Sequence, residues 1–181
     1  MALCFLLSTA NLAVAGWTPV HYYTQESALD ALFPKADHIN TEDHQFSPAE
    51  KTQIEARLGW HVPESKVQII KAYEDSEFLG YAIILDEIGK HDPITFITAV
   101  TPEYKVADVR VMVYREPFGD EVRKKRFLRQ FFKKSAQDPI MIHRDIDGIS
   151  GATFSTAALA SGVKKALIIV ETVSLPQFSQ R

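Results

Sequence analysis

The stretch from Asp147 to Thr156 has the composition of a phosphate-binding turn. Most of its residues are Gly, Ala, Ser or Thr, and an Ala- and Leu-rich segment with helical spacing follows at once. The first turn of a helix carries N–H groups without intrahelical partners and the positive end of the helix dipole. Small residues let an anion approach this backbone, so the stretch is a candidate phosphate site. A structural alternative stays open, because hydroxyl residues before a helix often serve only as caps.

Other familiar chemistries have little support in the sequence. There is no GxSxG elbow, Walker loop or GxGxxG fingerprint, which disfavours conventional hydrolases, nucleotidases and Rossmann proteins. The histidines show no metal-ligand spacing such as HExxH, and we interpret them as surface residues: His21, His38, His44, His61, His91 and His143. No metal site is therefore expected.

Residues 1–15 form an apolar run that ends in Ala13-Val14-Ala15, a small-x-small pattern typical of a signal peptide. We expect cleavage after Ala15. The usual basic start is missing, so either the true start lies upstream or the run is something else. It is too short to span a bilayer and no other apolar run comes close, so no membrane span is expected in the mature chain. Cys4, the only cysteine, lies within this run, which excludes disulfides and thiolate-bound clusters from the mature protein.

Composition favours one soluble globular domain. The chain has 181 residues, 46% hydrophobic and 24% charged, with a net charge of −3, and this charge gives no sign of nucleic-acid binding. We expect a helical N-terminal segment over 16–62, a main domain over 63–175 and a tail over 176–181.

Two helices are expected in the N-terminal segment. The first covers Glu26 to Phe33. The second begins with Ser47 as N-cap, Pro48 in the first helical position and Glu50 completing a capping box. The polar stretch from Lys35 to Phe46 between them is expected to be a loop.

From residue 66 the hydrophobic period becomes that of strands. We expect an antiparallel sheet buried mainly on one side, with Val109, Val111 and Val113 on one face and Met112 and Tyr114 on the other. The last two strands should form a hairpin. The expected strands are Val67–Tyr73, Leu79–Ile88, Ile94–Val100 and Val106–Tyr114.

Three further segments complete the expected α+β fold, an antiparallel sheet flanked by helices in a single domain. The loop from Gly89 to Pro93 either lines a site or is an ordinary solvated turn. Asp120 to Lys134 should be a basic helix, since residues 115–134 hold eight Lys and Arg against three Asp and Glu, a local charge of +5. It is either a solvated face or, over 121–134, a docking patch for an acidic partner. A final helix is expected from Ser155 to Thr172.

The opening stretch also carries a family resemblance. Asp147 to Thr153 resembles the Asp-x-x-Ser/Thr-Gly-Ala-Thr signature of the FMN-binding domain family, which includes the Rnf complex G subunit and the sodium-translocating NADH:quinone reductase C subunit. Gly80-Tyr81, Asp92-Pro93-Ile94 and the segment from Glu116 to Gly119 are similar to further landmarks of that family in the same order. The resemblance covers roughly residues 66–172.

The resemblance implies a covalent flavin. In this family the last Thr of the signature is esterified by the FMN phosphate, which an exported, magnesium-dependent flavin transferase supplies from FAD. Carried over, Thr153 is the attachment site, and Ser150, Gly151 and Ala152 form the turn around the phosphate. Because a carboxylate repels a phosphodiester, we expect Asp147 to serve transferase recognition or to cap the turn.

The other landmark implies that Glu116 and Gly119 lie near the isoalloxazine ring, although Pro-Phe stands between them where the family often has Thr-Pro. The expected protein is an exported, periplasmic or otherwise extracytoplasmic flavoprotein that carries electrons through covalent FMN. Its expected partners are the flavin transferase and a redox protein, with no nucleic acid. Two alternatives stay open: a small flavin-dependent reductase, and a non-flavin binding or adaptor module.

Overall fold

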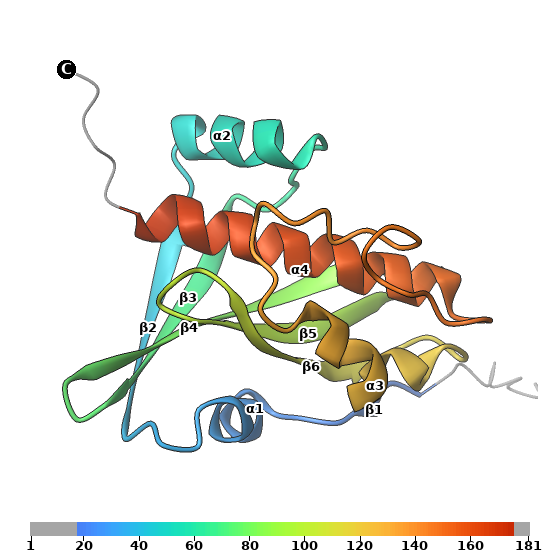
Figure 1. Ribbon diagram of the computed structural model, residues 1–181, viewed down its shortest axis with the longest axis horizontal. Coiled ribbons are helices and arrows are strands. Elements are labelled where there is room, and N and C mark those ends of the chain that lie inside the picture. The colour runs from blue at the N-terminus through green and yellow to red at the C-terminus, as the bar shows by residue number, and fades with distance from the viewer. Residues whose placement is uncertain (1–17, 176–181) are drawn as a thin grey trace, which may run out of the picture.

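The computed structural model describes residues 18–175. The signal peptide and the C-terminal tail expected at 1–15 and 176–181 lie outside this range. Six strands form one antiparallel sheet in the order β1-β6-β5-β4-β3-β2 (Figure 1). The strands are β1 (Val20–His21), β2 (His38–Gln45), β3 (Lys66–Glu74), β4 (Glu77–Ile88), β5 (Pro93–Val100) and β6 (Val106–Tyr114).

The four strands expected from residue 66 onward are confirmed as β3 to β6, and β5 and β6 form the expected hairpin. The expectation of a loop from Lys35 to Phe46 is wrong. This stretch contains β2, which pairs with β3 from His38↔Tyr73 to Gln45↔Lys66. Most side chains of β2 are exposed, as on many edge strands. Backbone pairing rather than an apolar pattern makes this strand, so the segment 16–62 is not purely helical.

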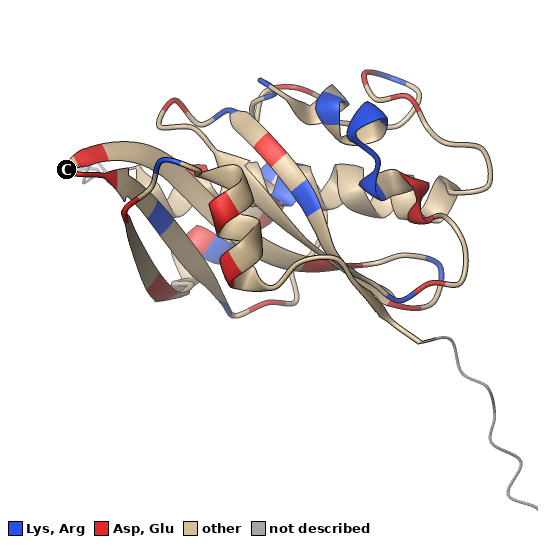
Figure 2. Ribbon diagram, turned by 90° about the horizontal axis from the view of Figure 1, so that it is seen from below, with Lys and Arg blue, Asp and Glu red and all other residues tan. Residues whose placement is uncertain are grey.

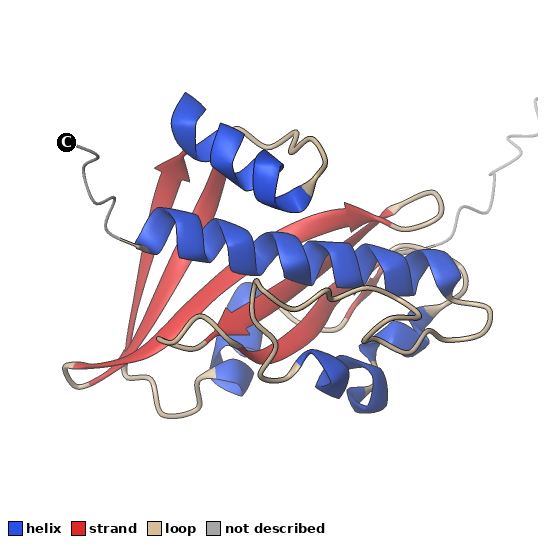
Figure 3. Cartoon of the chain, turned by 45° about the horizontal axis from the view of Figure 1, so that its top comes forward, coloured by secondary structure: helices blue, strands red, loops and turns tan. Residues whose placement is uncertain are grey.

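Helices cover both faces of the sheet (Figures 1 and 3). α2 (Pro48–Leu58) and α4 (Thr153–Ser174) contact each other on one face. The core on that face joins residues of both helices to the sheet. α1 (Gln25–Leu32) lies on the other face, where Ala28 and Leu29 pack with Ile70 and Ile97. The expected sheet buried mainly on one side is therefore wrong.

The face assignment along β6 is also wrong at its end. Val109, Val111 and Tyr114 belong to the core under α4, whereas Met112 and Val113 belong to the core under α1. The cause is an irregular pairing with β5, in which Thr95 lies opposite Val113 but Phe96 lies opposite Val111. A bulge of this kind reverses the alternation of side chains beyond it. It turns Tyr114 toward α4.

The basic helix expected from Asp120 to Lys134 is replaced by three short turns. These are η1 (Asp120–Arg123), α3 (Lys125–Leu128) and η2 (Arg129–Phe131). Lys124 has extended backbone angles between the first two. Lys133 and Lys134 exchange backbone hydrogen bonds with Val106, at the start of β6. Pairing with the sheet therefore ends the helical stretch, and its Lys and Arg residues are clustered along these turns (Figure 2).

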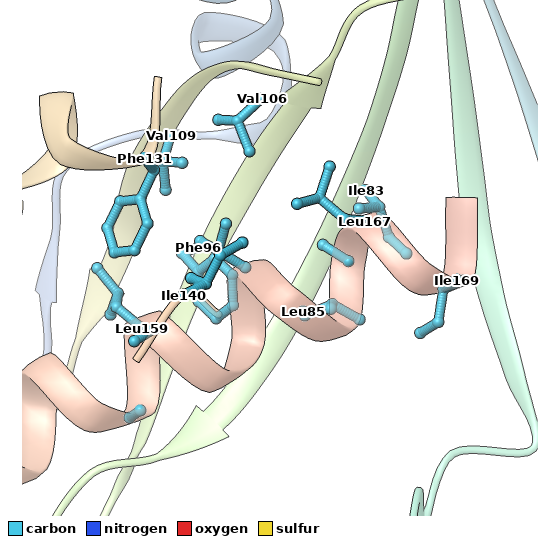
Figure 4. Packing of buried hydrophobic residues seen from close by; sticks show 14 of the residues in the cluster. Ile83, Leu85, Phe96, Val106, Val109, Phe131, Ile140, Leu159, Leu167 and Ile169 are labelled. Atoms are coloured by element: carbon cyan, nitrogen blue, oxygen red, sulfur yellow. The ribbon is translucent and has the colours of Figure 1, made fainter. Parts of the chain in front are cut away.

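α4 is the central helix and begins two residues before the expected Ser155. In Figure 4, Leu159 of α4 lies beside Phe131, and Leu167 of α4 lies beside Ile83 of the sheet. α4 is long and apolar enough to cross a membrane by length and composition, but 72% of its most apolar window is buried inside the domain. Its hydrophobic surface is therefore used in packing the core.

Candidate functional site

The turn before α4 brings Thr153 to the surface. Ala152 N–H donates to the Ile149 carbonyl at 3.0 Å, which closes the turn. Gly151 has φ +80°, a conformation that residues with a Cβ rarely adopt. Thr153 is the first residue of α4 and is exposed. A hydroxyl group therefore lies at the positive end of a 22-residue helix.

Among residues 18–175, no side chain caps the first turn of α4. The nearby hydroxyls are used elsewhere: Ser155 Oγ lies 2.8 Å from Tyr114 Oη, and Thr156 Oγ1 donates to the Thr153 carbonyl at 2.9 Å. The alternative in which hydroxyl residues only cap this helix is thus contradicted, as is a capping role for Asp147. The N–H groups of the first turn are available for an anion.

A hollow of about 230 Å³ lies beside Thr153. Three segments far apart in the sequence form it: the loop after β4, the turn after β6 and the start of α4. The residues lining it are Lys90, His91, Glu116, Pro117, Phe118, Gly151, Ala152, Thr153, Phe154 and Ser155.

Glu116 fastens the loop after β4 to this hollow. Its side chain is buried, with 3% of the residue exposed. Its Oε1 accepts hydrogen bonds from His91 N–H at 2.5 Å and Asp92 N–H at 3.0 Å. Burial raises the pKa of Glu116, but these backbone donors lower it more, so the net shift is downward. A Cβ at Gly89 would lie 2.8 Å from Oε1, so a larger residue there would displace this carboxylate. Glu116 is therefore an ionised, anchored carboxylate.

Tyr114 joins the other two segments. Its buried hydroxyl donates to the Phe118 carbonyl at 2.6 Å and lies 2.8 Å from Ser155 Oγ on α4. Gly119 has φ +93°, and a Cβ there would lie 2.8 Å from Tyr114 Oη and 3.0 Å from Ser155 Oγ. Burial raises the pKa of Tyr114, which keeps the hydroxyl protonated as a donor. The turn after β6 is thereby held against the start of α4.

Only some of the site residues predicted from the sequence line the hollow beside Thr153. Thr153, Ala152, Gly151 and Glu116 line the hollow. Gly119 is buried behind its wall, and Ser150 is exposed on the turn outside it. Neither position tests their expected contacts with the flavin.

Asp147 lies at a separate hollow of about 440 Å³, together with Lys124, Arg126 and Gln130. Its backbone is fixed there, since Asp147 N–H donates to Gln130 Oε1 at 2.7 Å and its carbonyl accepts from Gln130 Nε2 at 3.2 Å. Within the described residues, its carboxylate makes no hydrogen bond or ion pair. Asp147 is thus held apart from the Thr153 hollow, with its carboxylate exposed.

Sequence reasoning missed part of the lining. Lys90 and His91 of the Gly89–Pro93 loop line the hollow. That this hollow is a functional site stays a prediction. Phe118 and Phe154 adjoin the recognised landmarks but carry no signal of their own. In the part of the chain that the structure describes, no three His, Cys, Asp or Glu side chains are grouped as a metal site.

Comparisons with known proteins agree with this architecture. Residues 89–168 match the FMN-binding domain family. The G subunit of the proton-translocating ferredoxin:NAD(+) oxidoreductase complex of Clostridium ljungdahlii is 29% identical over 109 residues, which cover 56% of this chain and 58% of that protein. The chain therefore matches little more than half the length of this relative.

Two solved structures share the fold. NqrC of Shewanella oneidensis has a TM-score of 0.54 at 16% identity, covering 84% of this chain and 91% of that chain. The C subunit of the Na(+)-translocating NADH-quinone reductase of Parabacteroides distasonis has a TM-score of 0.55 at 15% identity, covering 86% of each chain. Together with the signature and the landmarks in order, these matches identify an FMN-binding domain over residues 89–168. The chain shares the fold of the two C subunits.

Proposed function

We propose that this protein is an exported flavoprotein that carries FMN covalently on Thr153 Oγ and transfers electrons outside the cytoplasm. The observation that carries the proposal is an exposed threonine at the uncapped start of α4, inside an FMN-binding domain. The proposed export rests on the apolar run at 1–15, which lies outside the described residues. The related G subunit belongs to an oxidoreductase complex, which supports a role in electron transfer.

The residues at the hollow fit a flavin phosphate. A phosphodiester keeps one negative charge, and a helix N-terminus stabilises such a charge by about 0.3–1 kcal/mol when exposed. The first-turn N–H groups of α4 have no side-chain cap, and Lys90 adds positive charge to the lining. Glu116 is held by the 90–92 loop through hydrogen bonds, so its acceptor atom is already occupied.

Attachment needs no redox change. Thr153 Oγ forms a bond to the FMN phosphorus of FAD, the bond from that phosphorus to the bridging oxygen breaks, AMP leaves and the threonine proton is released. The expected catalyst is the magnesium-dependent flavin transferase. Asp147, exposed at the neighbouring hollow and fixed by Gln130, is the proposed recognition point for this enzyme.

Once attached, FMN supplies the redox chemistry, and the protein supplies its position and surroundings. The basic turns over 121–134 are the proposed docking surface for an acidic redox partner, since they concentrate Lys and Arg in a chain of net charge −3. Association through this surface should weaken as salt rises.

The deciding experiment is peptide mass analysis of protein exported together with a flavin transferase. We expect the peptide containing Thr153 to carry the mass of FMN, and Thr153→Ala to abolish it completely. Thr52→Ala is the matched control, because Thr52 is an exposed threonine near the start of α2, outside the signature; it should retain the modification. An unmodified Thr153 peptide in the presence of active transferase would contradict the proposal. Colourless protein would favour the adaptor alternative, and sustained turnover of a small acceptor would favour the reductase.

A further inference from the structure

Phe118 and Phe154 are the two most exposed large aromatic side chains among residues 18–175. They are 81% and 59% exposed, and both line the hollow beside Thr153. Leaving two aromatic rings in water at one small hollow is unfavourable, because apolar surface is stabilised by burial. Neighbouring exposed apolar residues often mark a surface that another group covers.

The backbone presents both rings from fixed positions. Phe118 precedes Gly119 in a turn whose carbonyl is bound by Tyr114 Oη. Phe154 is the second residue of α4, and the next residue, Ser155, is within hydrogen-bond distance of the same hydroxyl. One buried tyrosine thus holds the segments that carry the two rings. The rings are exposed, but the backbone on which they stand is anchored in the core.

We propose that Phe118 and Phe154 contact the isoalloxazine ring of the flavin and cover part of it from solvent. This inference rests on the proposed attachment at Thr153. Thr153 is adjacent to Phe154 in the chain and shares the hollow with Phe118, so a tethered flavin lies within reach of both. Aromatic rings pair favourably with a flat, conjugated ring in offset or edge-on arrangements. The competing interpretation is that a partner protein, rather than the flavin, covers Phe118 and Phe154.

Tryptophan substitutions test the contact directly. An indole that touches a flavin quenches its fluorescence by electron transfer, and this quenching requires close approach. We expect Phe118→Trp and Phe154→Trp to reduce fluorescence per attached flavin several-fold. Phe132→Trp is the matched control, because Phe132 is also well exposed, at 55%, but is not among the residues that line the hollow.

A second measurement uses the double variant Phe118→Ala/Phe154→Ala. Loss of the two rings should increase quenching of the flavin by iodide several-fold, whereas Phe132→Ala should leave it unchanged. Equal fluorescence in all three tryptophan variants, with FMN present on the Thr153 peptide, would overturn the ring contact and leave the attachment intact. Absence of FMN from that peptide would instead overturn the attachment, and this inference with it. Because both side chains are exposed, all variants should unfold at the wild-type temperature.

Discussion

The starts of α2 and α4 differ in how their first N–H groups are satisfied. α2 has a complete capping box, in which Ser47 Oγ accepts from Glu50 N–H at 3.2 Å and Glu50 Oε2 accepts from Ser47 N–H at 2.7 Å. α4 has Ala152 as its N-cap residue and no side-chain cap, although Ser155 and Thr156 stand in its first turn. The same chain therefore closes one helix start and leaves the other available to a ligand.

The open start of α4 is not a general feature of this helix. Three turns further along, Lys165 is buried, with 4% of the residue exposed. Its Nζ pairs with Glu64 Oε1 and Glu87 Oε1, each at 2.6 Å. Burial raises the pKa of Glu87, and the paired Lys165 opposes this shift. Polar groups within α4 are thus matched by partners, which makes the uncapped Thr153 end the exception.

Breaking the Lys165 cluster should have the largest effect on stability. Lys165→Met leaves two carboxylates without a counter-charge in a largely buried setting, and we expect the free energy of unfolding to fall by about 3–5 kcal/mol. Urea unfolding measures this change. The variant Lys165→Met/Glu64→Gln/Glu87→Gln is the control and should recover most of the loss. If Lys165→Met alone had the same free energy of unfolding as wild type, within error, the ion pairs of Lys165 would not stabilise α4.

The comparison of the two helix starts predicts unequal effects of removing a hydroxyl. Ser47→Ala removes a cap and should lower the stability by about 1 kcal/mol. Thr153→Ala removes an exposed hydroxyl that caps nothing, and its effect on the unflavinylated protein should stay within about 0.5 kcal/mol. Both are measured by denaturant unfolding of protein made without transferase. If Thr153→Ala lowered the stability as much as Ser47→Ala, the Thr153 hydroxyl would be stabilising the fold. The two helix starts would then not differ in this respect.

The smallest expected effect concerns pH. Burial raises the pKa of Glu50, but hydrogen bonds from Ser47 and the nearby His44 lower it more, so it lies below its ordinary value of 4.5. The unfolded state therefore binds a proton first as pH falls. The stabilisation from Glu50 is present above pH 4.5 and is lost as pH falls through the folded pKa.

We expect Glu50→Gln to reduce the acid sensitivity of stability below pH 4.5, the ordinary pKa of this carboxyl, measured by urea unfolding at a series of pH values. Thr153→Ala is the control and should leave the pH dependence unchanged, since no carboxylate caps α4. Identical pH profiles for Glu50→Gln and wild type would refute the role assigned to this carboxylate.

Local patterns were sufficient for much of the fold. The apolar and β-branched runs predicted β3 to β6, and Ser47, Pro48 and Glu50 predicted the start of α2, because these signals act between residues close in sequence. The small residues at 147–153 predicted a turn before a helix. Even there, the expected helix start was two residues late.

Long-range pairing explains the errors. β2 has few apolar residues and forms because β3 offers a free edge. The basic segment ends its helical turns where Lys133 and Lys134 pair with Val106. The irregular pairing of β5 and β6 reverses the face of Tyr114. In each case the pairing partner is distant in sequence, so the spacing of hydrophobic residues alone could not predict it.

The sequence by itself determined the α+β class, the strands of the sheet centre, the capped start of α2 and the signature that ends at Thr153. The tertiary structure alone decided that the 90–92 loop, the turn after β6 and the start of α4 form one hollow. It did so through hydrogen bonds of Glu116 to the 90–92 loop and of Tyr114 to Ser155, which join residues 24 to 41 positions apart. Propensity and capping act locally, whereas the buried hydrogen bonds that assemble a site depend on the packing of distant segments.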